Sequence, residues 1–216
     1  MKKIIIAVSV MVAGCAPNPG PIFADFLVIE EGVACEIPTA NETALRQIRG
    51  FVDIAGGAQF LTGVALTSTV TSPAVIVGNS TVEKSNREQV VLEEMVLNYT
   101  TTPKRGAAFK EERIKLGGSF PKTAVFVANV IGPLAAANII ENAVVDASSI
   151  TDVAPDRVTL NVSVEFKGHL SGSNQAFATG KYLLPIEMVR SACTPRVTLE
   201  TAVCGNLGQN QRVTCQ

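Results

Sequence analysis

An unbroken alternation of apolar and polar residues from Arg157 to Lys167 constrains the fold more than any other feature of the sequence. The apolar positions are Val158, Leu160, Val162, Val164 and Phe166. Successive side chains of a β-strand point to opposite faces, so a period of two indicates a strand with one buried and one solvent-facing side. The segment therefore predicts a long strand at the surface of a hydrophobic core.

A second apolar run, from Phe177 to Met188, follows this strand closely. The residues between them, Gly168 to Asn174, are rich in glycine, serine and asparagine and predict a turn. Two strands joined by a short turn form a hairpin. Pro185 lacks the backbone N–H that a sheet interior needs, which predicts an edge or a strand end at that position.

Other parts of the chain carry similar β-branched runs between glycine, asparagine and proline punctuation. They cover Gly63 to Val77, Val90 to Thr102 and Phe120 to Ile131, and the last is apolar on both faces, as a central strand would be. Helical spacing after Pro133 predicts a helix over Leu134 to Asp146, and a shorter helix is expected over Thr43 to Phe51.

Together these elements predict a mainly β fold: an antiparallel Ig-like β-sandwich with one or two short helices, one of them at an end of the sandwich. A closed β-barrel of similar strand count is the alternative. The 216 residues contain no linker long enough to separate domains, so residues 23–216 are expected to form one domain with a disulfide-bonded C-terminal tail.

The N-terminus has the organisation of a secretory signal. Two lysines precede the apolar run Ile4 to Ala13, which is too short for a membrane-spanning helix, and small residues follow it. Residues 1–14 are therefore predicted to be a signal peptide. Residues 15–22 contain Pro17, Pro19 and Pro21 and predict a semi-extended tether.

The tetrapeptide Val12-Ala13-Gly14-Cys15 resembles the lipobox of bacterial lipoproteins. The resemblance implies cleavage between Gly14 and Cys15, a diacylglycerol thioether on the Cys15 sulfur, and acylation of the new amine by a fatty acid such as palmitate. Two or more acyl chains anchor a protein stably in a bilayer. Ala16, rather than an aspartate, follows the cysteine, which by the same resemblance implies the outer membrane, with the domain facing either the periplasm or the outside.

Four cysteines remain after the lipidated one, and an even number in an exported chain predicts two disulfides. The turn-forming residues between Cys204 and Cys215 favour a local bridge there, which leaves Cys35 to pair with Cys193. All three pairings of four cysteines remain open. The wide spacing of these cysteines does not fit a zinc site.

The charge balance and the motifs of the sequence indicate few candidate catalytic or binding sites. Eighteen basic and 19 acidic residues leave no excess for nucleic-acid binding. A hydrolase of the serine–histidine type would have to use His169, the single histidine, which is expected in a turn beside two serines. Glu93 and Glu94 are adjacent on a strand and should face opposite ways, and Glu111 with Glu112 belongs to a charged stretch expected to be solvated. No metal or cofactor is predicted, although three loop acids could hold calcium: Asp146, Asp152 and Asp156.

The C-terminal third shows a second resemblance. It rests on Leu160 to Gly168, Gly172, Leu184-Pro185-Ile186, Cys193, Cys204-Gly205, Gly208-Gln209 and Cys215. This pattern is similar to uncharacterised predicted lipoproteins of predatory and social delta-type bacteria, which implies an exported sandwich and carries no activity. The sequence thus favours a non-catalytic, lipid-anchored binding or structural module. The alternatives are an accessory subunit of an envelope secretion, motility or assembly machine, and a hydrolase using His169.

Overall fold

The computed structural model describes residues 22–28, 46–70, 75–77, 80–82, 89–147, 156–192, 197–199 and 213–215. The predicted signal peptide and most of the tether lie outside these ranges. The strands are β1 Ile22–Leu27, β2 Gly50–Asp53, β3 Leu61–Ser68, β4 Val75–Val77, β5 Ser80–Val82, β6 Val90–Thr102, β7 Glu112–Lys115, β8 Ser119–Phe120, β9 Thr123–Asn129, β10 Val158–Leu170, β11 Ala176–Ala178, β12 Tyr182–Val189, β13 Val197–Leu199 and β14 Val213–Cys215. The helices are a 3₁₀ turn, Ile54–Gly56, and α1, Pro133–Glu141.

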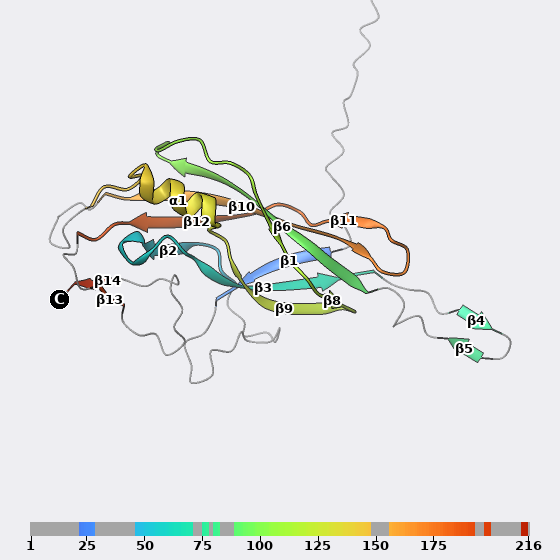
Figure 1. Ribbon diagram of the computed structural model, residues 1–216. Coiled ribbons are helices and arrows are strands. Elements are labelled where there is room, and N and C mark those ends of the chain that lie inside the picture. Colours follow the sequence, from blue (N-terminus) through green and yellow to red (C-terminus); the bar gives the residue numbers. More distant parts are fainter. Residues whose placement is uncertain are drawn as a thin grey trace, which may run out of the picture.

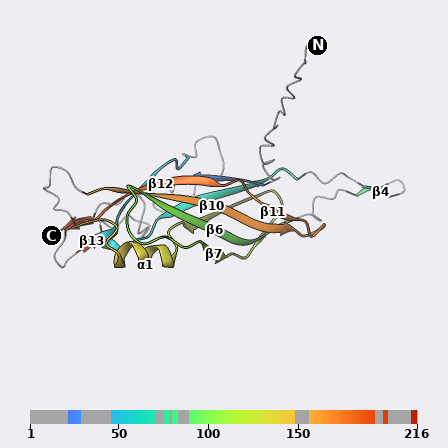
Figure 2. The same ribbon diagram turned by 90° about the horizontal axis from the view of Figure 1, so that it is seen from above.

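Two sheets make up the body of the molecule (Figure 1). The large sheet has the order β2-β12-β10-β6-β7, with β8 and β11 added at its ends, and the small sheet has the order β1-β3-β9. The hairpin β4–β5 projects away from both sheets in both views, and α1 lies at the opposite end (Figure 2). Backbone pairing among the described residues leaves the two sheets separate and open.

The core lies between the two sheets. Phe166 of β10 lies 6.4 Å from the ring of Phe26 on β1 and 5.9 Å, edge to face, from that of Phe126 on β9. Tyr182 of β12 stacks on Phe26 at 4.3 Å. These rings join both sheets into one buried cluster, which offset and T-shaped aromatic geometry stabilises beyond simple burial. The predicted mainly β, sandwich-like fold is therefore confirmed.

The predicted hairpin is present, and β10 is longer than expected. β10 and β12 pair antiparallel from Val158 opposite Met188 to Val164 opposite Tyr182. The strand continues past Lys167 to Leu170, so the expectation of a turn at Gly168 and His169 was wrong, and the turn begins at Ser171. Pairing with both β6 and β11 keeps these two residues in the ladder.

The expectation of a helix over Thr43 to Phe51 was wrong in its described part. Arg46 forms a bridge to Leu27, and Gly50–Asp53 is strand β2, which pairs parallel with β12. A Cβ on Gly50 would lie 2.5 Å from the ring of Phe60, so the close packing of this aromatic side chain fixes glycine there. The β2–β12 pairing is also an exception to the predicted antiparallel arrangement.

Helix α1 begins at Pro133, as predicted, because proline suits the first helical position. It ends at Glu141, five residues before the predicted end. Ala143 adopts a left-handed conformation, and Val144 donates a backbone hydrogen bond back to Ile139. The apolar residues Val144 and Val145 are fully buried after the helix has ended, which explains why the sequence pattern continued beyond it.

The run Phe120 to Ile131 is not a central strand. It divides between β8, which joins the large sheet, and β9, which pairs with β3 and forms an edge of the small sheet within the described residues. None of the described helices is long and apolar enough to cross a lipid bilayer.

Candidate functional site

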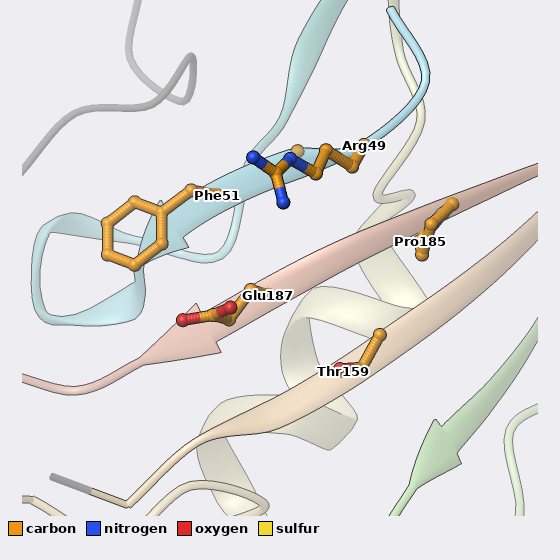
Figure 3. Close-up of a pocket in the computed structure, with 6 residues that line it drawn as sticks. Arg49, Phe51, Thr159, Pro185 and Glu187 are labelled. Carbon is orange, nitrogen blue, oxygen red and sulfur yellow. The ribbon is translucent and has the colours of Figure 1, made fainter. Parts of the chain in front are cut away.

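A groove of about 400 Å³ lies on the outer face of the large sheet, where β2, β12 and β10 run side by side. Figure 3 shows its side chains, with the helix α1 behind the sheet. Parallel pairing places Phe51 beside Glu187, and antiparallel pairing places Glu187 beside Thr159. The lining residues are Arg49, Gly50, Phe51, Thr159, Pro185 and Glu187.

The groove combines a cation, an aromatic ring and a neutralised carboxylate. Glu187 accepts a hydrogen bond from Arg157 at 2.5 Å, so its negative charge is balanced. Arg49 is exposed and forms no ion pair with any residue that the structure describes. The exposed Arg49 guanidinium can donate two parallel N–H hydrogen bonds to a planar anion. Phe51 and Pro185 form apolar sides of the groove. The arrangement suits binding of a ligand with a carboxylate and an apolar part.

Sequence reasoning missed this groove. Arg49 and Phe51 lie between β1 and β3 in the sequence, whereas Pro185 and Glu187 belong to the C-terminal hairpin, and the parallel pairing of β2 with β12 joins them. No periodic pattern in the sequence predicts that β2, a strand of four residues, pairs in parallel with another strand. Pro185 was predicted at an edge or strand end, and it lies within β12, one position before the pairing with β2 begins.

His169 is paired with a carboxylate. Its Nδ1 lies 3.0 Å from Oε1 of Glu93, on the outer face of the large sheet. A carboxylate that holds one ring nitrogen leaves the other for proton transfer, which is two-thirds of a serine hydrolase site. Ser171 is two positions further along, and its Oγ accepts from the N–H of Gln89 at 3.0 Å.

The prediction that Glu93 and Glu94 face opposite ways was wrong. The register between β6 and β10 shifts at Gly168, where a β-bulge inserts one extra residue into β6. Leu92 and Met95 are buried, and both glutamates between them lie on the outer side of the sheet, where Glu93 is exposed and the Glu94 side chain is 14% exposed. Glu94 pairs with Arg113 at 3.4 Å and Lys115 at 3.6 Å, so the bulge frees Glu93 for His169 while Glu94 joins the charged surface.

Glu112 is buried, which contradicts the expectation of a solvated charged stretch. Its two carboxylate oxygens accept backbone hydrogen bonds from Leu134 at 3.0 Å and Ala135 at 2.8 Å. The first N–H groups of a helix have no partner within it, and the helix dipole favours negative charge there. Glu112 on β7 thus caps α1 and fixes the helix to the large sheet. A Cβ on Gly132 would lie 2.5 Å from this carboxylate.

Tyr99 completes the attachment of the helix. Its hydroxyl accepts a hydrogen bond from the N–H of Gly132 at 2.9 Å. Burial raises the pKa of the Tyr99 hydroxyl well above its ordinary value, and the nearby Glu112 carboxylate raises this pKa further. The cluster is fully hydrogen-bonded and buried, so it is a structural joint.

Two of the acids proposed as calcium ligands face an arginine. Arg105 lies 2.5 Å from Asp156 and 3.7 Å from Asp146, whereas Asp152 is outside the described residues. A hydrogen bond from the Asp146 backbone, followed by the Arg105 guanidinium, lowers the pKa of the Asp156 carboxyl. Among the described residues, no group of three or more histidine, cysteine or acidic side chains is placed to hold a metal ion.

Most residues of the predicted cleavage site, lipidation site and disulfides lie outside the described ranges. These residues are Gly14, Cys15, Cys35, Cys193 and Cys204. Cys215 ends β14, opposite Val197 on β13.

Comparison of the chain with protein-family models, with curated proteins and with solved structures found no match.

Proposed function

We propose that the protein is a lipid-anchored module of the bacterial envelope that binds a ligand without transforming it. The observation that carries the proposal is the tetrapeptide Val12-Ala13-Gly14-Cys15 directly after an apolar run of signal-peptide length. Cys15 and Ile22, the first residue of β1, are seven positions apart. The acylated sulfur would therefore hold the sandwich close to the outer membrane.

Cell fractionation tests the anchor. In a bacterium with two membranes, we expect the protein in the membrane pellet after a high-salt wash, and its intact mass should correspond to a chain that starts at Cys15 and carries three acyl chains. Cys15→Ser should leave the signal peptide uncleaved and the chain without lipid, whereas Ala16→Ser should be processed normally. A processed N-terminus elsewhere, or a mature Cys15 without lipid, contradicts the proposal.

The groove supports the binding role because Arg49, which forms no ion pair with a described residue, lines it together with Phe51. We expect an aromatic carboxylate such as phenylacetate to perturb the NMR signals of β2 and β12. Arg49→Ala should weaken this binding about tenfold, as loss of a charge-assisted hydrogen bond does. Lys181→Ala removes an exposed cation elsewhere and is the matched control. Equal binding by both variants would argue against the groove.

An accessory subunit is the second candidate, and the edge of β9 favours it. Val130 donates to Phe60 and Ser68 donates to Lys122, so the even-numbered residues of β9 pair with β3. The backbone groups of Thr123, Val125 and Val127 therefore point away from β3, and no charged residue lies within the strand. An extended segment of another envelope protein could add to this edge.

A pair of substitutions at one position tests the docking edge. Val125→Pro removes an outward N–H, while Val125→Thr keeps it and retains strand propensity. A stoichiometric envelope complex that survives in Val125→Thr and is lost in Val125→Pro would support the accessory role. A complex that survives in both variants would rule out this edge as the docking site.

The hydrolase alternative depends on the His169–Glu93 pair. His169→Ala should abolish any hydrolysis of envelope esters or peptides if the alternative holds, and Glu93→Gln should reduce it. Unchanged behaviour of both variants would discard it.

A further inference from the structure

The two most exposed large apolar side chains among the described residues adjoin one end of the groove. Ile48 is 72% exposed and directly precedes Arg49. Leu183 is 61% exposed and lies two positions before Pro185 on β12. Since β2 and β12 run parallel, Ile48 and Leu183 precede the groove toward the same end of it. The other exposed large apolar residues lie on α1, β1 and β9: Leu134, Ile140, Phe23 and Val127.

Buried contacts hold the segment that carries Ile48 and Arg49. Gln47 is buried, and its side-chain amide donates a hydrogen bond to the Arg49 carbonyl. The backbone N–H of Gln47 donates to the Phe26 carbonyl at 2.8 Å, and the Gln47 carbonyl accepts from the Tyr182 hydroxyl at 2.6 Å. Ile48 and Arg49 thus extend from a backbone that is fixed before a ligand binds, which lowers the entropic cost of binding.

The outward side chains of β12 recur at every second residue beside the groove. Leu183, Pro185 and Glu187 alternate with residues that are fully buried in the core. Parallel pairing places Phe51 beside Glu187, which adds an aromatic ring to this row. In an extended peptide, the side chains of one side also recur every ~6.6 Å, at twice the rise per residue. An extended peptide that lies along β12 can therefore set successive side chains of one side against this row.

The charges at the groove favour an anionic group in its ligand. Arg157 neutralises Glu187 at 2.5 Å, whereas Arg49 forms no ion pair with any described residue. Figure 3 shows the Arg49 guanidinium extended along β2 toward Phe51. A carboxylate bound by this guanidinium lies close to the apolar sides of the groove. The terminal carboxylate of a peptide suits this arrangement, because the last Cα carries both the charged group and the last side chain.

We propose that the groove binds the C-terminus of an extended peptide from a partner protein. The terminal carboxylate binds Arg49, and the last, apolar side chain packs against Phe51 and Pro185. The peptide then leaves the groove at the end where Ile48 and Leu183 lie, and its side chain two positions earlier contacts this apolar surface. This inference rests on the proposed binding role of the groove and names the class of ligand that it binds.

Three probes test the ligand class on the full-length protein in detergent micelles, with the NMR signals of β2 and β12 as the readout. They are the peptide acetyl-Thr-Leu-Thr-Phe with a free carboxylate, the same peptide with a C-terminal amide, and phenylacetate. We expect the peptide acid to bind at least about tenfold more tightly than the amide, which lacks the charge, and than phenylacetate, which lacks the peptide chain. In Arg49→Ala, the acid and the amide should bind equally.

Substitutions at the apolar end of the groove test the path of the peptide. Leu183→Ser and Ile48→Ser should each weaken binding of the peptide acid at least about threefold and leave phenylacetate binding unchanged, because phenylacetate does not reach this end. Leu134→Ser is the matched control, since Leu134 is 58% exposed on α1. Far-UV circular dichroism verifies the fold of each variant, and the comparison of acid with amide needs no variant.

The outcomes separate this inference from the binding role itself. Equal binding of acid and amide by the natural protein, or peptide binding no tighter than that of phenylacetate, would overturn the inference, while phenylacetate binding would leave the binding role intact. Peptide binding that neither Leu183→Ser nor Ile48→Ser weakens would overturn the proposed path. Absence of binding by all three probes would contradict the binding role of the groove as well.

Discussion

The buried carboxylate of Glu112 connects two elements, β7 and α1, through hydrogen bonds. It projects from β7, accepts two backbone N–H groups of α1 and lies against Gly132. A capping group usually comes from the residue that precedes the helix, and here that residue is a glycine without a side chain. A carboxylate supplied by a distant strand replaces it, so helix capping and sheet attachment depend on the same side chain.

Removal of this carboxylate should destabilise the protein strongly. Glu112→Ala leaves two buried N–H groups without an acceptor, and each charge-assisted hydrogen bond contributes about 1.5–3 kcal/mol. We expect a loss of about 3 kcal/mol in the free energy of unfolding, measured by urea denaturation, and a smaller loss for Glu112→Gln, which keeps one acceptor. Glu111→Ala, at the neighbouring exposed position, is the control and should leave the midpoint unchanged. Equal stability of all three variants would contradict the capping role.

Gly168 is the residue on which the bulge between β6 and β10 depends. A Cβ there would lie 2.0 Å from the carbonyl oxygen of Val91 and 3.0 Å from the ring of Phe177. Because backbone cannot move aside as a flexible side chain can, Gly168→Ala should cost about 3 kcal/mol or more. Gly180→Ala has open space around it and should be within about 0.5 kcal/mol of the natural protein. Thermal unfolding of both variants measures the difference, and a stable Gly168→Ala would show that the bulge can rearrange.

Single residues at such joints were the hardest to predict from the sequence. The alternation rule assigned Glu93 and Glu94 to opposite faces, and the rule fails where an extra residue enters one strand. Glu112 resembled its solvated neighbours because nothing in a charged stretch reveals that a helix N-terminus packs on it in space. Both errors have one cause: local patterns contain no information about the partner across the sheet.

At the scale of elements, prediction succeeded where a residue pattern alone determines the structure. Strand β6 has the predicted bounds, Val90–Thr102, and β10 and β12 form the expected hairpin. Pro133 marked the start of α1. Strand β2 was mistaken for a helix because only four residues form it and its pairing with β12 decides its conformation. The groove was missed for the same reason, since it lies on this pairing.

The side chain of Asp156, just before β10, accepts hydrogen bonds from the Asp146 backbone and from Arg105. These two donors, the Asp146 backbone first, lower the pKa of the Asp156 carboxyl. A lowered folded pKa means stability that is present above the unfolded pKa, ~3.9, and is lost as pH falls through the folded value. Asp156→Asn should therefore reduce the free energy of unfolding on the order of 1 kcal/mol at pH 7, with a shrinking difference below pH ~4.

Asp146→Asn is the control for this prediction. The Asp146 side chain is 77% exposed and 3.7 Å from Arg105, so its removal should change stability little. Urea denaturation at several pH values measures both variants. A constant difference between natural protein and Asp156→Asn down to pH 2 would show that the ionised form of Asp156 is not what stabilises the connection.

At the scale of the whole molecule, the groove lies on the outer face of the large sheet, whereas β1, the first described strand, belongs to the small sheet. The sequence predicted the sandwich-like fold, which is confirmed, and a lipid anchor on Cys15, which stays a prediction. It did not predict that β1 belongs to the small sheet, because six residues contain no signal that chooses between two sheets.

The two tyrosines report on the integrity of the whole core at high pH. Burial raises the pKa of both hydroxyls, strongly for Tyr99 beneath α1 and less for Tyr182, where Asp25 adds to the rise. A folded pKa above the unfolded value of ~10 gives stability that is complete below pH 10 and is lost as pH rises through the folded value, because the unfolded chain releases its phenolic protons first. We therefore expect the protein to unfold in alkali with release of those protons.

Absorbance at 295 nm follows this titration without interference, since the chain has two tyrosines and no tryptophan. In Tyr182→Phe, the remaining Tyr99 signal should appear only together with loss of the far-UV circular dichroism of the sheets. In Tyr99→Phe, Tyr182 should ionise above pH ~10 and before the sheets are lost, because its hydroxyl is only partly buried and donates to the Gln47 carbonyl at the surface of the core. Ionisation of Tyr99 near pH 10 with the sheets intact would mean that the joint between α1 and the large sheet opens while the sandwich stays folded.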